Sequence, residues 1–137
     1  MKKDLPPNIV EDISIAVVLE SETPETKNWM VYLINEKDVA LKNVFVTSKG
    51  YGTKDDKAIK TTTLRHFIGD MDAHSVVKIE MIDPQVFGLT NEYWLSHYIG
   101  DTIYDKKYIF LPESIVDENL SRIPLVGKPG VLIGGNN

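Results

Sequence analysis

Apolar and polar residues alternate along most of this chain with a period of two, which is the pattern of a strand with one buried face. Residues 13–20 show it most clearly (Ile-Ser-Ile-Ala-Val-Val-Leu-Glu). Other β-rich runs occur at residues 29–34, 41–47, 59–68, 75–82, 91–99 and 102–110. Short segments rich in Gly, Asp, Asn and Pro separate the runs, and no segment has a convincing helical pattern. The sequence therefore predicts an all-β protein, an antiparallel β-sandwich of about seven strands.

The most specific local prediction is a hairpin formed by residues 91–99 and 102–110. Gly100-Asp101 suits a two-residue type II′ turn, because glycine at its first position accepts a positive φ. Large apolar side chains occur on both faces of this hairpin, so either both faces are partly buried or another segment covers one of them. The expected register pairs Tyr93 with Tyr108, Leu95 with Lys106 and His97 with Tyr104, and places Trp94, Tyr98, Ile103 and Ile109 on the opposite face.

The sequence predicts a single domain, residues 1–137. Three of its segments lie outside the expected strands. Residues 1–10 are expected to form a flexible arm, and residues 48–57 an exposed loop in which glycines provide positive φ angles. Residues 111–137 form an extended tail, because prolines and glycines prevent a regular helix there. The tail is too apolar to be left in solvent. We expect it to pack along the sandwich or add an edge strand, or else to dock onto a second subunit.

Composition narrows the classes of function. The 137 residues carry a formal net charge of −5, which disfavours attraction to nucleic acid and to anionic membranes. Because the chain has no cysteine, thiol catalysis, cysteine-bound zinc and disulfides are excluded. The apolar run at residues 13–19 is too short for a membrane span and no cleavage site follows it. We therefore expect a cytoplasmic protein that binds neither nucleic acid nor membrane.

Motifs that carry chemistry are missing from the sequence. The three histidines have no spacing typical of a metal site, and no serine occupies a G-x-S-x-G turn. The run at residues 50–54 lacks the spacing of a phosphate-binding loop. We therefore predict no enzyme, no cofactor and no metal. The least favoured alternative is a hydrolase that uses His66 and His97 with nearby carboxylates.

Aromatic residues are the best candidates for a binding surface. They can form the hot spot of a protein interface or stack against sugars, although cross-strand packing is a commoner reason for their presence. We predict a non-catalytic binding or assembly module that acts through an aromatic or apolar surface, with a protein partner or a homodimer. The alternative is a small-molecule or carbohydrate-binding domain. The candidate binding residues are Tyr51, Trp94, Tyr98 and Tyr104.

Several segments resemble a family of small uncharacterised bacterial proteins, and the resemblance covers nearly the whole chain. They are Trp29-Met-Val-Tyr-Leu-Ile-Asn35, Leu41-Lys-Asn-Val-Phe-Val46, Lys49-Gly-Tyr-Gly52, Thr63-Leu-Arg-His-Phe-Ile-Gly69 and Asp105-Lys-Lys-Tyr-Ile-Phe-Leu-Pro112. Some members are labelled phenylalanyl-tRNA synthetase alpha subunit, but a synthetase core is several times longer than this chain. The run of strand, turn and Leu-x-Asn-Val-x-Val is also similar to immunoglobulin-like accessory domains. That resemblance implies a fold and no particular activity.

Overall fold

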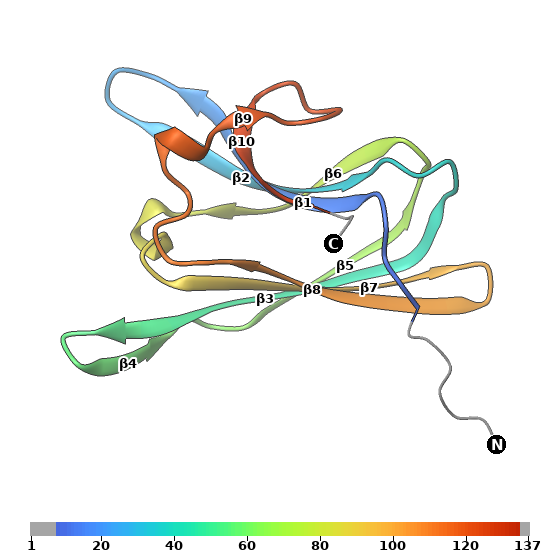
Figure 1. The fold of residues 1–137 in the computed structure, drawn as a ribbon, viewed down its shortest axis with the longest axis horizontal. Helices are drawn as coiled ribbons and strands as arrows, with labels where there is room; N and C mark the ends of the chain where they lie inside the picture. Colours follow the sequence, from blue (N-terminus) through green and yellow to red (C-terminus); the bar gives the residue numbers. More distant parts are fainter. Residues whose placement is uncertain (1–7, 135–137) are drawn as a thin grey trace.

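The computed structural model describes residues 8–134, which form two packed antiparallel sheets and two short 3-10 turns (Figure 1). The prediction of an all-β sandwich is confirmed. Ten strands occur instead of about seven, because the expected strand at residues 59–68 is broken in two and the tail adds two strands. The strands are β1 (Ile13–Glu22), β2 (Lys27–Asn35), β3 (Leu41–Lys54), β4 (Lys57–Lys60), β5 (Leu64–Met71), β6 (Ser75–Ile82), β7 (Thr90–Ile99), β8 (Thr102–Phe110), β9 (Ser121–Arg122) and β10 (Pro129–Ile133); the turns are η1 (Pro84–Val86) and η2 (Asp117–Asn119).

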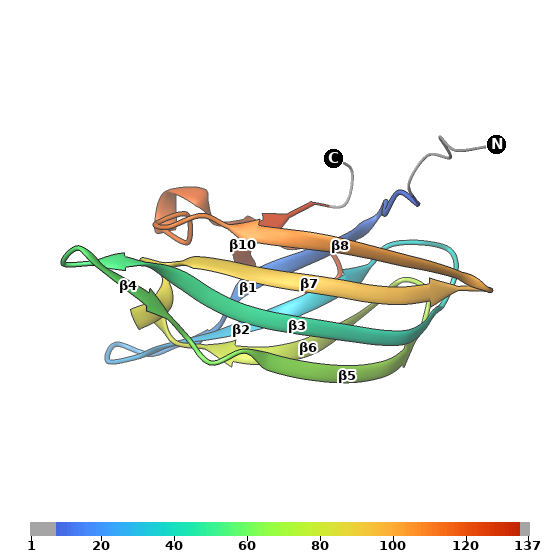
Figure 2. The same ribbon diagram turned by 90° about the horizontal axis from the view of Figure 1, so that it is seen from below.

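Each sheet has a long central strand. In the first sheet the order is β6-β2-β1-β10-β9. In the second sheet β3 pairs with β7 along one edge and with both β5 and β4 along the other, and β8 follows β7. Figure 2 shows β5, β3, β7 and β8 in this order across the second sheet. The strands β5 and β6 form edges of the two sheets on the same side of the sandwich, where they contact each other.

The alternating pattern of the sequence produces the core between the sheets. Ile13, Ile15 and Val17 of β1 point inward and are fully buried, as the period of two predicts. From the opposite sheet, the Tyr108 hydroxyl donates a hydrogen bond to the Ile13 carbonyl oxygen at 2.7 Å. This bond satisfies the only polar atom that the tyrosine ring brings into the core, and burial raises the pKa of Tyr108.

The tail packs on its own sandwich as far as residue 134. Strand β10 pairs with β1 in the middle of the first sheet, with Val131 opposite Val17. Ile123 is fully buried against the outer face of that sheet, where it joins Ala16, Val18, Tyr32 and Ile34 in a second apolar cluster. The tail therefore covers an outer face that would otherwise expose these side chains. The remaining residues of the expected tail, 135–137, lie outside the described part of the chain.

The last residues of the expected N-terminal arm are packed. Val10 is buried in the core, and the Asn8 side-chain amide donates to the Ile103 carbonyl oxygen at 2.7 Å. Residues 1–7 of the expected arm lie outside the described residues.

The expected loop at residues 48–57 is a hairpin instead. Strand β3 continues to Lys54, and β4 returns after a two-residue turn in which Asp55 and Asp56 both have positive φ, the conformation that a type I′ turn requires. Gly50 and Gly52 do not supply positive φ, contrary to expectation. Their role is steric, since a Cβ on Gly52 would lie 3.1 Å from the Leu89 side chain.

The hairpin of β7 and β8 has the predicted register, with Tyr93 opposite Tyr108 and His97 opposite Tyr104. Gly100 has a φ of +58° and Asp101 is not in the left-handed region, as a type II′ turn requires. One face of this hairpin points into the core and the other points away from the sandwich.

Candidate functional site

The outward face of the second sheet carries aromatic side chains from three neighbouring strands. The register places Phe45 of β3 between Phe67 of β5 and Ser96 of β7, and places Thr47 beside Trp94. Phe67 is 72% exposed and Trp94 is 43% exposed, although neither lies at a chain end. We call this surface the aromatic face; it is formed by Phe45, Tyr51, Phe67, Trp94 and Tyr98.

Charged side chains lie among these rings. The Lys107 ammonium lies 5.1 Å from the centre of the Trp94 ring, a cation–π contact. Lys49 lies 3.8 Å from the Glu92 carboxylate, which also accepts a hydrogen bond from the Tyr51 hydroxyl at 3.0 Å. That hydrogen bond to Glu92 raises the pKa of Tyr51. The buried Glu92 carboxylate on this face therefore already has an ion pair with Lys49 and a hydrogen bond from Tyr51.

A shallow hollow of about 430 Å³ lies in the middle of the aromatic face. Its apolar sides are Phe45 and Trp94, and its polar groups include hydroxyls of threonine and serine and the guanidinium of Arg65. The complete lining is Phe45, Thr47, Lys49, Thr63, Arg65, Glu92, Trp94 and Ser96.

Three of the four predicted binding residues lie on this face, spaced along its strands. Tyr51, Trp94 and Tyr98 point outward, whereas Tyr104 points inward and stacks on His97 with ring centres 5.4 Å apart. Tyr104 therefore does not belong to the aromatic face. Sequence analysis did not select Phe45 and Phe67, because their pairing across β3 and β5 depends on a register that no turn signal specified.

A second site lies at the open edge of the sandwich, where a β-bulge redirects Glu80 of β6. Val31 of β2 is opposite Glu80 and Tyr32 is opposite Lys78, so Ile79 is an extra residue in the strand. An extra residue reverses the alternation, and both Ile79 and Glu80 point toward the second sheet. The bulge thus brings a carboxylate, 14% exposed, to the boundary of the core.

Three side chains of the second sheet bind the Glu80 carboxylate. The Ser48 hydroxyl donates to Oε1 at 2.8 Å, and His66 Nε2 lies 2.7 Å from the same oxygen. The Tyr93 hydroxyl donates to Oε2 at 2.9 Å. Burial, and then the Glu80 carboxylate, raise the pKa of Tyr93, so this phenol stays protonated and acts as a donor. We call these four residues the Glu80 cluster.

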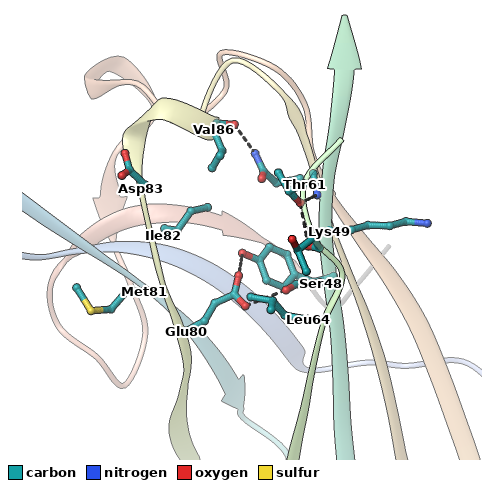
Figure 3. A pocket seen from close by; sticks show the side chains of 13 residues that line it. Ser48, Lys49, Thr61, Leu64, Glu80, Met81, Ile82, Asp83 and Val86 are labelled. Carbon is teal, nitrogen blue, oxygen red and sulfur yellow. Dashed lines mark hydrogen bonds between the residues drawn. The ribbon is translucent and has the colours of Figure 1, made fainter. Parts of the chain in front are cut away.

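The Glu80 cluster forms one end of a cleft of about 300 Å³ between β6 and the break that separates β4 from β5 (Figure 3). Glu80 and Ile82 point into it from β6, and Ser48 lies across from them on β3. Besides the Glu80 cluster members Ser48, Glu80 and Tyr93, the lining comprises Lys49, Gly50, Thr61, Thr62, Leu64, Met81, Ile82, Asp83, Val86 and Asn91. No signal in the sequence indicates this cleft, because the bulge that aims Glu80 has no local signature.

The two histidines of the hydrolase alternative have different surroundings. His66 lies on β5 and contacts Glu80, whereas His97 lies on β7 and stacks on Tyr104. Strand β3 separates the two strands. In the Glu80 cluster, Ser48 and His66 both bond the carboxylate. No hydrogen bond joins Ser48 to His66, and activation of a serine nucleophile requires such a bond.

Within residues 8–134 no group of three or more metal-ligating side chains is present.

His97 gives the protein a predictable response to acid. Its ring is fully buried, and no described residue hydrogen-bonds either ring nitrogen. Burial, together with Lys37, lowers the pKa of His97 to about 4, against a smaller opposite effect of Asp105. Because the unfolded histidine takes up a proton at higher pH than the folded one, stability is complete above pH 6.5 and falls as the pH drops toward 4.

We expect the free energy of unfolding to decrease by roughly 2 kcal/mol between pH 7 and pH 5 from His97 alone. Urea unfolding at a series of pH values measures this loss. His97→Phe, which can keep the stacking on Tyr104, should flatten the pH dependence in this window. An unchanged slope in His97→Phe would show that His97 is not the titrating group.

Taken together, these features define a small antiparallel β-sandwich with one aromatic outer face and one cleft at its edge. No helix within residues 8–134 is long and apolar enough to cross a membrane. Comparison of the chain with protein families, with curated proteins and with solved structures found no match.

Proposed function

We propose that this protein is a non-catalytic, cytoplasmic binding module whose aromatic face docks a partner protein. The observation that carries the proposal is the difference between the two outer faces. The tail covers apolar side chains of the first sheet with Ile123, whereas Phe67 and Trp94 of the second sheet remain exposed. Large apolar side chains exposed together on one face of a soluble protein are a feature of interaction sites.

The composition of the aromatic face supports a protein partner. Trp, Tyr, Phe and Arg are the residues enriched at the centre of protein interfaces. Phe67 and Arg65 lie on β5 and Trp94 lies on β7, on either side of β3. These rings stand on paired strands of a sheet, so little backbone ordering is needed when a partner binds.

The charges of the face indicate the chemistry of the partner. Arg65 and Lys107 lie beside the exposed rings, while the Glu92 carboxylate is engaged by Lys49 and Tyr51. The surface therefore offers positive charge around an apolar centre, although the whole chain has a net charge of −5. An apolar strip flanked by carboxylates complements it.

A photo-crosslinking amino acid tests the proposal. Placed at position 67 in the native cell, p-benzoylphenylalanine is expected to give one discrete adduct, which Trp94→Ala should reduce at least tenfold because truncating a hot-spot aromatic costs 2 kcal/mol or more. The matched control is position 81, where Met81 is 69% exposed but lies outside the aromatic face. Identical adducts from both positions would contradict a specific docking surface, and an adduct of twice the chain mass would identify a homodimer.

The hollow between Phe45 and Trp94 favours carbohydrate as a second candidate ligand. Hydroxyls of Thr47 and Ser96 and the guanidinium of Arg65 line it between the aromatic rings, a combination that can stack on a sugar ring and hydrogen-bond its hydroxyls. Saturable quenching or enhancement of Trp94 fluorescence across a panel of oligosaccharides, in a Trp29→Phe background, would favour this candidate over the protein partner.

The order of the strands supports an immunoglobulin-like description of the sandwich. The neighbours β1-β2-β6 correspond to strands A, B and E of that fold, and β5-β3-β7-β8 correspond to C′, C, F and G. Domains of this type commonly use the exposed face of the sheet that contains C, F and G for association, which agrees with the position of the aromatic face; this agreement is an analogy between folds.

A further inference from the structure

The cleft beside Glu80 has the hydrogen-bonding character of a binding site, independently of the aromatic face. It lies at the edge of the sandwich, whereas the aromatic face is on the outside of the second sheet (Figure 3). Its two ends are formed by the Glu80 cluster and by the segment around Val86, whose carbonyl oxygen accepts a hydrogen bond from Asn91. The lining therefore combines buried polar groups with aliphatic side chains.

The Glu80 carboxylate can accept one more hydrogen bond. An ionised carboxylate has about four lone-pair sites. Oε1 receives Ser48 and His66, and Oε2 receives Tyr93 alone among the described residues. One acceptor site of a largely buried anion is therefore left on Oε2.

The side-chain donors along the cleft are already used. The Ser48 and Tyr93 hydroxyls donate to Glu80, and the Thr61 hydroxyl donates to the Thr62 carbonyl oxygen at 3.1 Å. The Asn91 amide donates to the carbonyl oxygens of Val86, at 2.9 Å, and Leu89, at 3.3 Å. What these buried groups offer to a ligand is oxygen lone pairs. The Thr62 hydroxyl, at the exposed rim of the cleft, donates no hydrogen bond to another described residue.

The charge of the cleft is negative. Lys49 contributes to the lining, but its ammonium points away from the cleft and pairs with Glu92 on the opposite face of the sheet. Glu80 thus places its charge in the cleft without a lysine or arginine beside it. Leu64, Ile82 and Val86 provide apolar walls next to these oxygens.

We propose that the cleft binds a compact organic cation that carries several N–H donors on a short aliphatic stem, an alkylguanidinium or alkylammonium group. The nitrogen head donates to Glu80 Oε2 and to the neighbouring oxygens of Ser48 and Tyr93. The stem lies against Leu64 and Ile82. A neutral polyol would bring acceptors as well as donors, and those acceptors would find no available donor among the buried groups of the lining, so the cation fits this lining better.

The direct test is a titration of the ¹⁵N-labelled protein with agmatine, observed by amide chemical shifts. Saturable shifts confined to residues around the cleft, such as Gly50 and Ile82, are expected at millimolar concentration. Tetramethylammonium, which has the charge without N–H donors, and pentanol, which has a stem without charge, should each bind at least tenfold more weakly. Because agmatine carries two positive charges at neutral pH, butylguanidinium is titrated beside it as the singly charged match for tetramethylammonium. Equal binding of tetramethylammonium and butylguanidinium, or no localised shifts with agmatine, would overturn the proposal.

Matched variants separate site binding from general charge effects. Leu64→Arg places a tethered guanidinium at the mouth of the cleft and should abolish the agmatine shifts. Leu125→Arg makes the same change at an equally exposed leucine outside the cleft, and should leave them unchanged. Both positions are at the surface, so both variants are expected to fold. Agmatine binding that survives Leu64→Arg, or that Leu125→Arg abolishes, would refute this site.

A last comparison identifies the source of the cation. The capped tripeptide Gly-Arg-Gly presents the same guanidinium as agmatine, but on a backbone. Tighter binding of the peptide would assign the cleft to an arginine side chain of a protein, and tighter binding of agmatine would assign it to a free small amine. Binding of neither would overturn the proposal.

Discussion

Replacing Gly130 with alanine is expected to lower the free energy of unfolding by about 3 kcal/mol, the upper part of the usual range for overpacking. Gly130 lies on β10 between β1 and β9, with Val18 and Ser121 as its partners. An added Cβ would lie 2.7 Å from the Val17 carbonyl oxygen, 2.9 Å from Ile123 Cγ1 and 3.1 Å from Val18 Cα. These neighbours belong to the central strand and to the buried side chain of the tail, so they cannot move aside without disturbing both apolar clusters.

Urea unfolding of Gly130→Ala beside Gly88→Ala measures this effect. A Cβ on Gly88 would lie 3.3 Å from Glu113 Oε2, the end of a flexible side chain that can shift. Gly88→Ala should therefore change stability by no more than about 0.5 kcal/mol. Similar losses in the two variants would mean that close packing around β10 is not the reason for glycine at position 130.

The second large effect is expected at Glu80. Glu80→Leu should lower the free energy of unfolding by about 3–4 kcal/mol, because it leaves the hydroxyls of Tyr93 and Ser48 and the imidazole of His66 without their acceptor. Tyr93 is almost fully buried, so its hydroxyl can regain a partner only from water that enters the cleft. As a control, Glu22→Leu replaces an exposed glutamate and should change stability by about 0.5 kcal/mol or less.

A double-mutant cycle isolates the bond between Glu80 and Tyr93. Tyr93→Phe alone should cost about 2 kcal/mol, the range for a hydrogen bond to a charged group. The same substitution in the Glu80→Leu background should cost little or should stabilise, since it removes a hydroxyl that has already lost its acceptor. Additive losses from the two substitutions would show that the hydroxyl and the carboxylate do not support each other.

Much of the fold could be predicted from the sequence, because the relevant signals are local. Alternation at residues 13–19 specified the inward face of β1, and Gly100-Asp101 specified both a turn and a register. The hairpin at Asp55-Asp56 was missed because charged residues and glycines between strands are typical of exposed loops. There Gly52 is needed for space near Leu89 and Gly50 for space near Thr61 and Asn91, neighbours that the sequence does not reveal.

The candidate sites could be predicted less completely from the sequence than the fold. Trp94 and Tyr98 share a face by strand parity, and their outward position follows from the pattern. Grouping Tyr104 with them was wrong in geometry, because the predicted register already paired Tyr104 with the inward-facing His97. The Glu80 cluster depends on one extra residue in β6 and on contacts between two sheets, neither of which has a local signal.

The place of β10 has a consequence for the synthesis of the protein. Of the strands described, this one is synthesised last, and it pairs with the first strand, Val131 opposite Val17. A nascent chain that ends before residue 129 therefore exposes the side of β1 to which β10 bonds, together with Ala16 and Val18 on the face that Ile123 later covers. We expect the sandwich to complete its folding only after residue 133 has been synthesised and has left the ribosome. Until then β1 is an unpaired edge that a chaperone or another nascent chain can bind.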